Sequence, residues 1–154
     1  MSNFQELSNA AAPAFDVDGT LGGLAKWLRI LGFDATYPRP RPSAGRVFVT
    51  TKRRYSFLGT VVITEARPLR QLRELLDQIG IEPDPELFLS RCLVCNALVH
   101  VVPKEEIRDR VPARVFEITG TFSRCPDCGR IYWEGSHAER IKRRLEEDAA
   151  LSTT

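Results

Sequence analysis

The chain has 154 residues, 43% of them hydrophobic, which suffices for one ordinary domain or for a small domain with a second, smaller module. No apolar stretch approaches the about 20 residues of a membrane helix, and residues 1–15 lack a secretory leader, so we expect a protein of the reducing cytoplasm. The formal net charge of +2 conceals a basic segment, because residues 39–73 hold nine cations and a single acid, Glu65.

In chain order, residues 1–14 are expected to be a loose segment and residues 15–18 a short strand. Leucines then recur at helical spacing from Leu21 to Leu31, and Gly32 stands where a helix commonly ends. Residues 37–45 alternate proline with arginine. They predict an extended connector, since proline excludes a helix there.

Two runs rich in β-branched residues, 47–50 and 60–63, predict short strands. A helix is predicted over residues 68–79, with Thr64 as its N-cap and Gly80 at its end. Strand, loop, strand and helix in this order predict an α/β fold with a short, largely parallel sheet.

The basic segment predicts a surface for a polyanionic partner, with nucleic acid first. A solvated charged face is the alternative. Tyr55 and Phe57 lie within the segment and either stack on unpaired bases or pack against the sheet. The side chains expected to contact nucleic acid are Arg39, Arg41, Lys52, Arg53, Arg54, Arg67, Arg70 and Tyr55.

The prolines at positions 83 and 85 predict a border between two domains, over residues 15–86 and 87–148, with a loose tail at 149–154. In the second domain we expect a strand over 98–102, a short helix over 104–110 and strands over 115–118 and 130–133. A charged helix is expected to close the domain.

All four cysteines fall in two pairs with two residues between the thiols. This spacing lets both sulfurs of a pair bind one ion at about 2.3 Å, and Asn96 or Gly129 after each pair frees the backbone to turn. Two disulfides are the alternative, which a reducing compartment disfavours. The pattern therefore predicts a structural zinc ion held by Cys92, Cys95, Cys125 and Cys128.

Residues 15–21 read FDVDGTL, which is similar to the DxDGT motif of haloacid-dehalogenase-type phosphatases. In that family the first aspartate attacks phosphorus and the second acts as acid and base beside Mg²⁺. This interpretation also requires an apolar strand before the motif and a later pair of acids. The chain has Ala-Ala-Pro-Ala before the motif, and no acid pair closes a later strand.

A second resemblance covers far more of the chain. It rests on VDGTLGGLAKWLRILGFD at 17–34, FLSRCLVCN at 88–96, DRVP at 109–112 and CPDCGRIYWEGSH at 125–137. These blocks resemble the Mut-seven C-terminal RNase domain family, a PIN-like nuclease domain followed by a zinc ribbon. The resemblance implies RNA as substrate and carboxylates that gather Mg²⁺ or Mn²⁺. It makes Asp18, with Asp16 beside it, the candidate catalytic residues.

The chain departs from the family pattern in its acids. The connector at 37–45 replaces an acidic helix, and a strand that usually ends in a carboxylate is followed here by Lys52, Arg53 and Arg54. We therefore expect a shortened nuclease half that binds RNA with cleavage weakened or lost. One alternative is an active endoribonuclease that recruits a further acid, Asp34 or Glu65. Another is a zinc-ribbon module that docks on a ribosome or other ribonucleoprotein.

Overall fold

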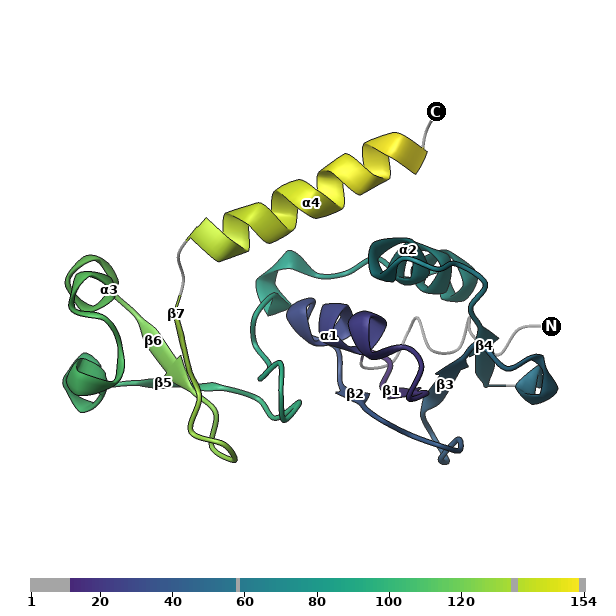
Figure 1. The fold of residues 1–154 in the computed structure, drawn as a ribbon, viewed down its shortest axis with the longest axis horizontal. Coiled ribbons are helices and arrows are strands. Elements are labelled where there is room, and N and C mark those ends of the chain that lie inside the picture. Colours follow the sequence, from purple (N-terminus) through teal and green to yellow (C-terminus); the bar gives the residue numbers. More distant parts are fainter. Residues whose placement is uncertain (1–11, 58, 134–135, 153–154) are drawn as a thin grey trace. The chain divides into compact units, whose positions relative to one another are not determined.

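The computed structural model describes residues 12–57, 59–133 and 136–152 (Figure 1). The chain divides into two compact units, one ending at Leu89 and the other beginning at Ser90.

The first unit is built on a parallel sheet of four strands in the order β2-β1-β3-β4. Its elements are β1 (Phe15–Val17), α1 (Gly22–Ile30), β2 (Ala35–Thr36), β3 (Val47–Thr50), the 3-10 turn η2 (Arg53–Tyr55), β4 (Thr60–Val62), α2 (Pro68–Ile79) and the 3-10 turn η3 (Pro85–Leu87). The α/β fold with a short parallel sheet is thereby confirmed. The sequence did not predict β2, which is only two residues long.

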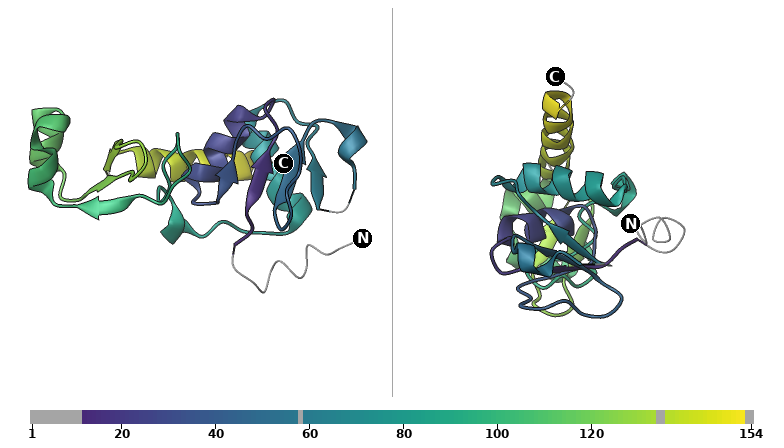
Figure 2. Two further views of the ribbon diagram at one scale, coloured as in Figure 1. Left: turned by 90° about the horizontal axis from the view of Figure 1, so that it is seen from below. Right: turned by 90° about the vertical axis from the view of Figure 1, so that its right-hand side faces the viewer.

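The two faces of this sheet differ in chemistry because side chains alternate along each strand. One face is apolar and buried, and its members are Phe15, Val17, Ala35, Val47, Val49 and Val61. Helices α1 and α2 pack against each other and lie on one side of the sheet (Figures 1 and 2). The opposite face carries Asp16, Thr36 and Phe48, which the strand register places side by side.

Helix α2 has the predicted bounds, but its predicted N-cap is wrong. Arg67 occupies the N-cap position in extended backbone and Pro68 begins the helix, so no side chain caps it. Thr64 instead donates from its hydroxyl to a Glu74 carboxylate oxygen at 2.8 Å. The helix ends as predicted at Gly80, whose left-handed φ of 69° suits glycine.

The second unit holds an antiparallel sheet of three strands in the order β5-β6-β7. Its elements are β5 (His100–Val102), the 3-10 helix η4 (Lys104–Arg110), α3 (Ala113–Ile118), β6 (Phe122–Arg124), β7 (Ile131–Trp133) and the closing helix α4 (Ser136–Ser152). No helix in the described part of the chain is both long and apolar enough to cross a membrane.

The predicted strand over 115–118 is wrong, because these residues form most of α3. Val115, Phe116 and Ile118 favour strands locally, but Phe116 stacks on Phe122 at a centroid distance of 6.4 Å. Packing therefore overrides local preference, and the strand lies instead at β6. The helix predicted over 104–110 is a 3-10 helix, and the strand predicted from residue 98 begins at His100.

Candidate functional site

The two cysteine loops of the second unit have the same backbone geometry. The amide of Asn96 donates to the Cys92 carbonyl, and the amide of Gly129 donates to the Cys125 carbonyl, each at 3.0 Å. Asn96 and Gly129 both adopt left-handed φ, at 66° and 74°. The predicted turn after each pair is thus confirmed, with asparagine taking the role of glycine in the first loop.

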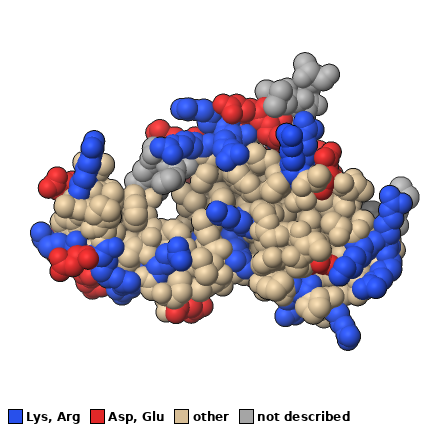
Figure 3. Space-filling view, in the orientation of Figure 1, with Lys and Arg blue, Asp and Glu red and all other residues tan. Residues whose placement is uncertain are grey.

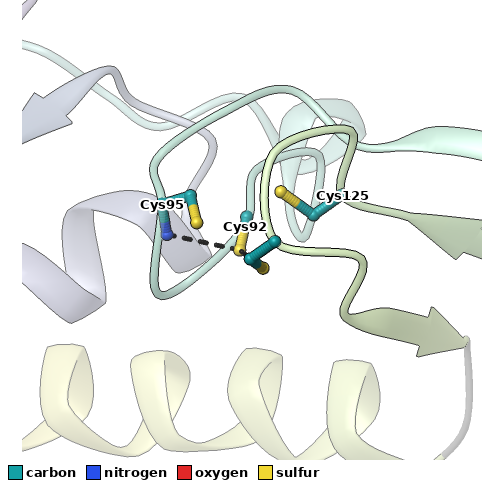
Figure 4. Close-up of side chains that lie close together, drawn as sticks. Cys92, Cys95 and Cys125 are labelled. Carbon is teal, nitrogen blue, oxygen red and sulfur yellow. Dashed lines mark hydrogen bonds between the residues drawn. The ribbon is translucent and has the colours of Figure 1, made fainter.

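These loops bring all four thiols together. The sulfur atoms of Cys92, Cys95, Cys125 and Cys128 all lie within 4.8 Å of one another. In Figure 4 the three labelled cysteines point into the space between the loops. Tetrahedral coordination at 2.3 Å places sulfurs about 3.8 Å apart. The Sγ atoms of Cys92 and Cys128 are 3.7 Å apart, so the group fits one metal ion.

Tyr132 of β7 holds one of these sulfurs in place. Its hydroxyl lies 3.1 Å from Cys92 Sγ and accepts a hydrogen bond from the Leu93 amide at 3.1 Å. Burial raises the pKa of Tyr132, as does its contact with Cys92, so the hydroxyl keeps the proton that it donates to sulfur. A donor of this kind orients a metal-binding thiolate and tunes its affinity.

Four thiols this close do not ionise equally. Burial raises the pKa of Cys92, but hydrogen bonds from Tyr132 and from the Cys95 amide outweigh it and lower that pKa to about 6. The pKa of Cys95 is raised to about 12, first by its hydrogen bond with Cys128. Metals bind thiolates, whose negative charges repel one another at these distances. A bound cation would offset that repulsion and displace the protons from the thiols that are still protonated.

In the first unit, Asp18 follows β1 at the carboxyl end of the parallel sheet and is 3% exposed. Its Oδ1 accepts hydrogen bonds from the Thr20 amide at 3.1 Å and the Thr20 hydroxyl at 3.2 Å. Its Oδ2 accepts from the Thr50 hydroxyl at 2.8 Å and lies 3.3 Å from Lys52 Nζ. The ammonium of Lys52 therefore forms an ion pair with the carboxylate that, by the family resemblance, would bind Mg²⁺ or Mn²⁺.

Asp16 is fully buried and has a different set of partners. Its Oδ1 accepts from the Thr36 hydroxyl at 2.6 Å and from Arg46 Nε at 2.8 Å. Its Oδ2 accepts from both the amide and the hydroxyl of Ser43. Arg39 adds a weaker ion pair, with Nε 3.7 Å from Oδ1. The connector is thus fastened to the sheet through this carboxylate.

Each aspartate has the four acceptor positions of a carboxylate filled by donors of the chain itself. Burial raises the pKa of both groups, but the hydrogen bonds, from Ser43 first at Asp16 and from Thr20 first at Asp18, outweigh it and lower both pKa values. The donors that bond to Asp16 differ from those that bond to Asp18. Asp16 bonds to Thr36 of β2, whereas Asp18 bonds to Thr50 of β3.

The two further acids that the sequence offered, Asp34 and Glu65, have other roles. Asp34 pairs with Arg46 through two nitrogen–oxygen contacts of 3.0 and 2.7 Å. Glu65 is exposed, and its amide donates to Glu74. Across residues 12–57, 59–133 and 136–152, the four cysteines form the one group of three or more side chains suited to a metal.

The predicted nucleic-acid residues fall into two classes. Tyr55 forms the first class, because it is half-buried against Phe48. Arg46 was not predicted to contact nucleic acid; it is half-buried and pairs with Asp16 and Asp34. The exposed cations are Arg39, Arg41, Lys52, Arg53, Arg54, Arg67 and Arg70. Figure 3 shows Lys and Arg side chains gathered at the right-hand edge, over the connection between β3 and β4.

Besides Thr20, which lies two residues from Asp18, five residues of the site were missed from sequence: Thr36, Ser43, Arg46, Thr50 and Tyr132. Their partners are distant along the chain, as with Ser43 and Asp16 or Thr50 and Asp18. The one available signal was the hydroxyl of Thr50 at the end of a predicted strand, because the carboxyl ends of neighbouring parallel strands lie at the same edge of a sheet.

A family model described as the Mut7-C RNAse domain matches residues 13–145. This is the family that the sequence blocks resemble, so that assignment is confirmed. Neither the curated proteins nor the solved structures contain a match to the chain.

Proposed function

The chain belongs to the Mut7-C RNAse domain family, and from this membership we propose that it binds RNA, with metal-dependent cleavage weakened or lost. One observation carries the proposal. Asp16, within β1, and Asp18, which follows it at the carboxyl end of the sheet, have their acceptor positions filled by protein donors, and Lys52 Nζ lies 3.3 Å from Asp18.

Weak cleavage follows from what a divalent ion requires. Mg²⁺ and Mn²⁺ prefer oxygen ligands and carry two positive charges, so they need carboxylate oxygens that are free to coordinate. At Asp18 an ion would have to displace the Lys52 ammonium and hydroxyl hydrogen bonds that already stabilise the charge. Arg53 and Arg54 add like charge next to Lys52 in the chain, which disfavours a cation further.

RNA binding is supported by the exposed cations of the same unit. Guanidinium groups pair with phosphate oxygens in two-point contacts, and each phosphate neutralised releases counterions. Lys52, Arg53 and Arg54 follow the strand whose end faces Asp18, and no acid occurs between Asp34 and Glu65. In this proposal the side chains contact the phosphates that a metal ion contacts in an active relative.

For the cysteine group we propose one structural Zn²⁺. Four thiolates with no open position are the ligand set of structural zinc sites, and the spacing of the sulfurs fits such a site. The ion holds the two loops together and takes no part in chemistry on RNA.

Tyr132→Phe is expected to weaken zinc binding by about 10–100-fold, because it removes the hydroxyl that donates to Cys92 Sγ. Competition with a chromophoric chelator measures the affinity. Tyr37→Phe is the matched control, since it also removes one tyrosine hydroxyl, bonded to the Gly19 carbonyl in the other unit. Equal affinities in all three proteins would contradict the role given to Tyr132.

RNA binding and cleavage are tested with labelled single-stranded and structured RNA, with and without Mn²⁺. We expect salt-sensitive binding and no metal-dependent cleavage. Replacing Lys52, Arg53 and Arg54 by glutamine is expected to lower the slope of log affinity against log salt by up to about 2 units, at about 0.7 per phosphate contact. A variant neutralised at the exposed Arg114, Lys142 and Arg143 is the charge-matched control.

Two results would replace this proposal. Mn²⁺-dependent cleavage that Asp18→Asn abolishes would make the protein an active endoribonuclease. Absence of RNA binding at low salt would favour a zinc-ribbon module that docks on protein, within a ribosome or another ribonucleoprotein.

A further inference from the structure

The connection between β3 and β4 separates its two aromatic side chains. Tyr55 packs edge-on against the buried Phe48, with ring centroids 5.4 Å apart. Phe57 lies beyond it, 6.1 Å from Tyr55, and half of its surface is exposed. Among the described phenylalanines, Phe57 alone is exposed. Burial therefore accounts for Tyr55 but leaves Phe57 without an explanation from packing.

Backbone hydrogen bonds stabilise the turn that carries Phe57. The Tyr55 amide donates to the Lys52 carbonyl at 3.1 Å, and the Phe57 amide donates to the Tyr55 carbonyl at 2.8 Å. The Thr60 amide returns to the Phe57 carbonyl at 3.0 Å. A backbone stabilised in this way has less conformational freedom to lose when a partner stacks on the ring, which favours binding.

The same turn carries three cations in succession. Lys52, Arg53 and Arg54 are all exposed, and the Arg54 guanidinium lies 5.1 Å from the centroid of the Tyr55 ring. Exposed aromatic rings beside cations are the arrangement with which proteins hold unpaired nucleotides, because bases stack on the ring while phosphates pair with the charges. A docking surface for a neutral protein partner would not need the charges.

We propose that Phe57 stacks on an unpaired base while Lys52, Arg53 and Arg54 hold the neighbouring phosphates, which makes single-stranded RNA the substrate class of this surface. The inference rests on the proposed RNA binding. In a duplex the faces of the bases are covered by their neighbours, so a ring of this kind has nothing to stack on. Stacking is tolerant of base identity, so this surface selects strandedness and not sequence.

The test uses the full chain and fluorescence anisotropy, with a labelled uridine oligonucleotide of about 12 nucleotides and a duplex of equal length. Phe57→Ala is expected to weaken binding of the single strand by about 5-fold or more and to leave duplex binding unchanged. Phe57→Trp is expected to retain single-strand affinity. Ile118→Ala, at a more exposed apolar residue of the other unit, is the matched control and is expected to change neither.

Salt dependence separates stacking from charge. Phe57→Ala is expected to keep the wild-type slope of log affinity against log salt, whereas Arg53→Gln with Arg54→Gln is expected to reduce it by about 1.4 units. Equal losses on single strand and duplex, or no loss in Phe57→Ala, would overturn the role of Phe57 while the proposed RNA binding stands. A wild-type protein that binds neither RNA would overturn both.

Discussion

Removing the metal is expected to unfold the second unit and to leave the parallel sheet of the first intact. The second unit has a very small core, because its buried apolar side chains, among the described residues, are Ile107, Phe122, Cys92 and Cys125. A structural zinc site contributes roughly 10–16 kcal/mol in comparable small modules, far more than two core side chains supply. Two of the four buried side chains, Cys92 and Cys125, belong to the cysteine group proposed to bind the ion.

Hydrogen exchange with and without a strong chelator measures this effect strand by strand. The amides of β6, at the centre of the antiparallel sheet, are expected to lose protection on chelation. Those of β1 and β3 are the internal control and are expected to keep it. Full protection of β6 after verified loss of the metal would show that the ion does not hold the unit together.

Arg46→Met is expected to lower the free energy of unfolding of the first unit by about 3–5 kcal/mol, since it leaves the fully buried Asp16 carboxylate without its closest charge partner. Arg39→Met is the matched control. Arg39 pairs with the same carboxylate oxygen, but at 3.7 Å and with 44% of its side chain exposed. Its loss is expected to cost less than about 1 kcal/mol.

Urea unfolding measures both changes. The chain has two tryptophans, so a Trp133→Phe background leaves Trp27 of α1 as the fluorescent reporter of the first unit. Equal stabilities of the Arg46→Met and Arg39→Met proteins would contradict the central role of the Arg46–Asp16 pair.

The same carboxylates set the acid limit of the first unit. The pKa values of Asp16 and Asp18 are lowered from 3.8 in the folded protein, so between the folded values and pH 3.8 the unfolded chain binds more protons than the folded one. Their stabilisation is complete well above pH 3.8 and is lost as the pH falls through the lower folded values. Asp16→Asn, which does not titrate, is expected to lack its share of this acid dependence.

Local patterns predicted the regular elements well where the patterns were long. The leucine spacing and Gly80 predicted the bounds of α2, and β-branched runs predicted β3 and β4, although β4 ends one residue before the predicted end. The failures were short elements decided by packing. Two residues of β2 carry no periodicity, and α3 forms from strand-favouring residues because Phe116 stacks on Phe122.

The two halves of the site were predictable to different degrees. The group of four cysteines suited to a metal could be predicted from spacing alone, since two residues between thiols already fix the geometry of each loop. The surroundings of Asp16 depend on which strands are neighbours. Only the register that pairs β1 with β2 brings Thr36 to this carboxylate. The sequence showed that acids were missing near Asp18, but it did not show that Lys52 would stand against it.

The bonds between the connector and Asp16 limit which amino-acid substitutions the chain can accept. Ser43 donates to that carboxylate from both its amide and its hydroxyl, and Arg46 donates both to it and to Asp34. A lineage that returned an acid to position 52 would still meet two aspartates whose oxygens are committed to the fold. Regaining a metal would require several coordinated replacements, and those that expose the buried charge first would be lost to instability. On the proposed function, the departure from cleavage is therefore hard to reverse.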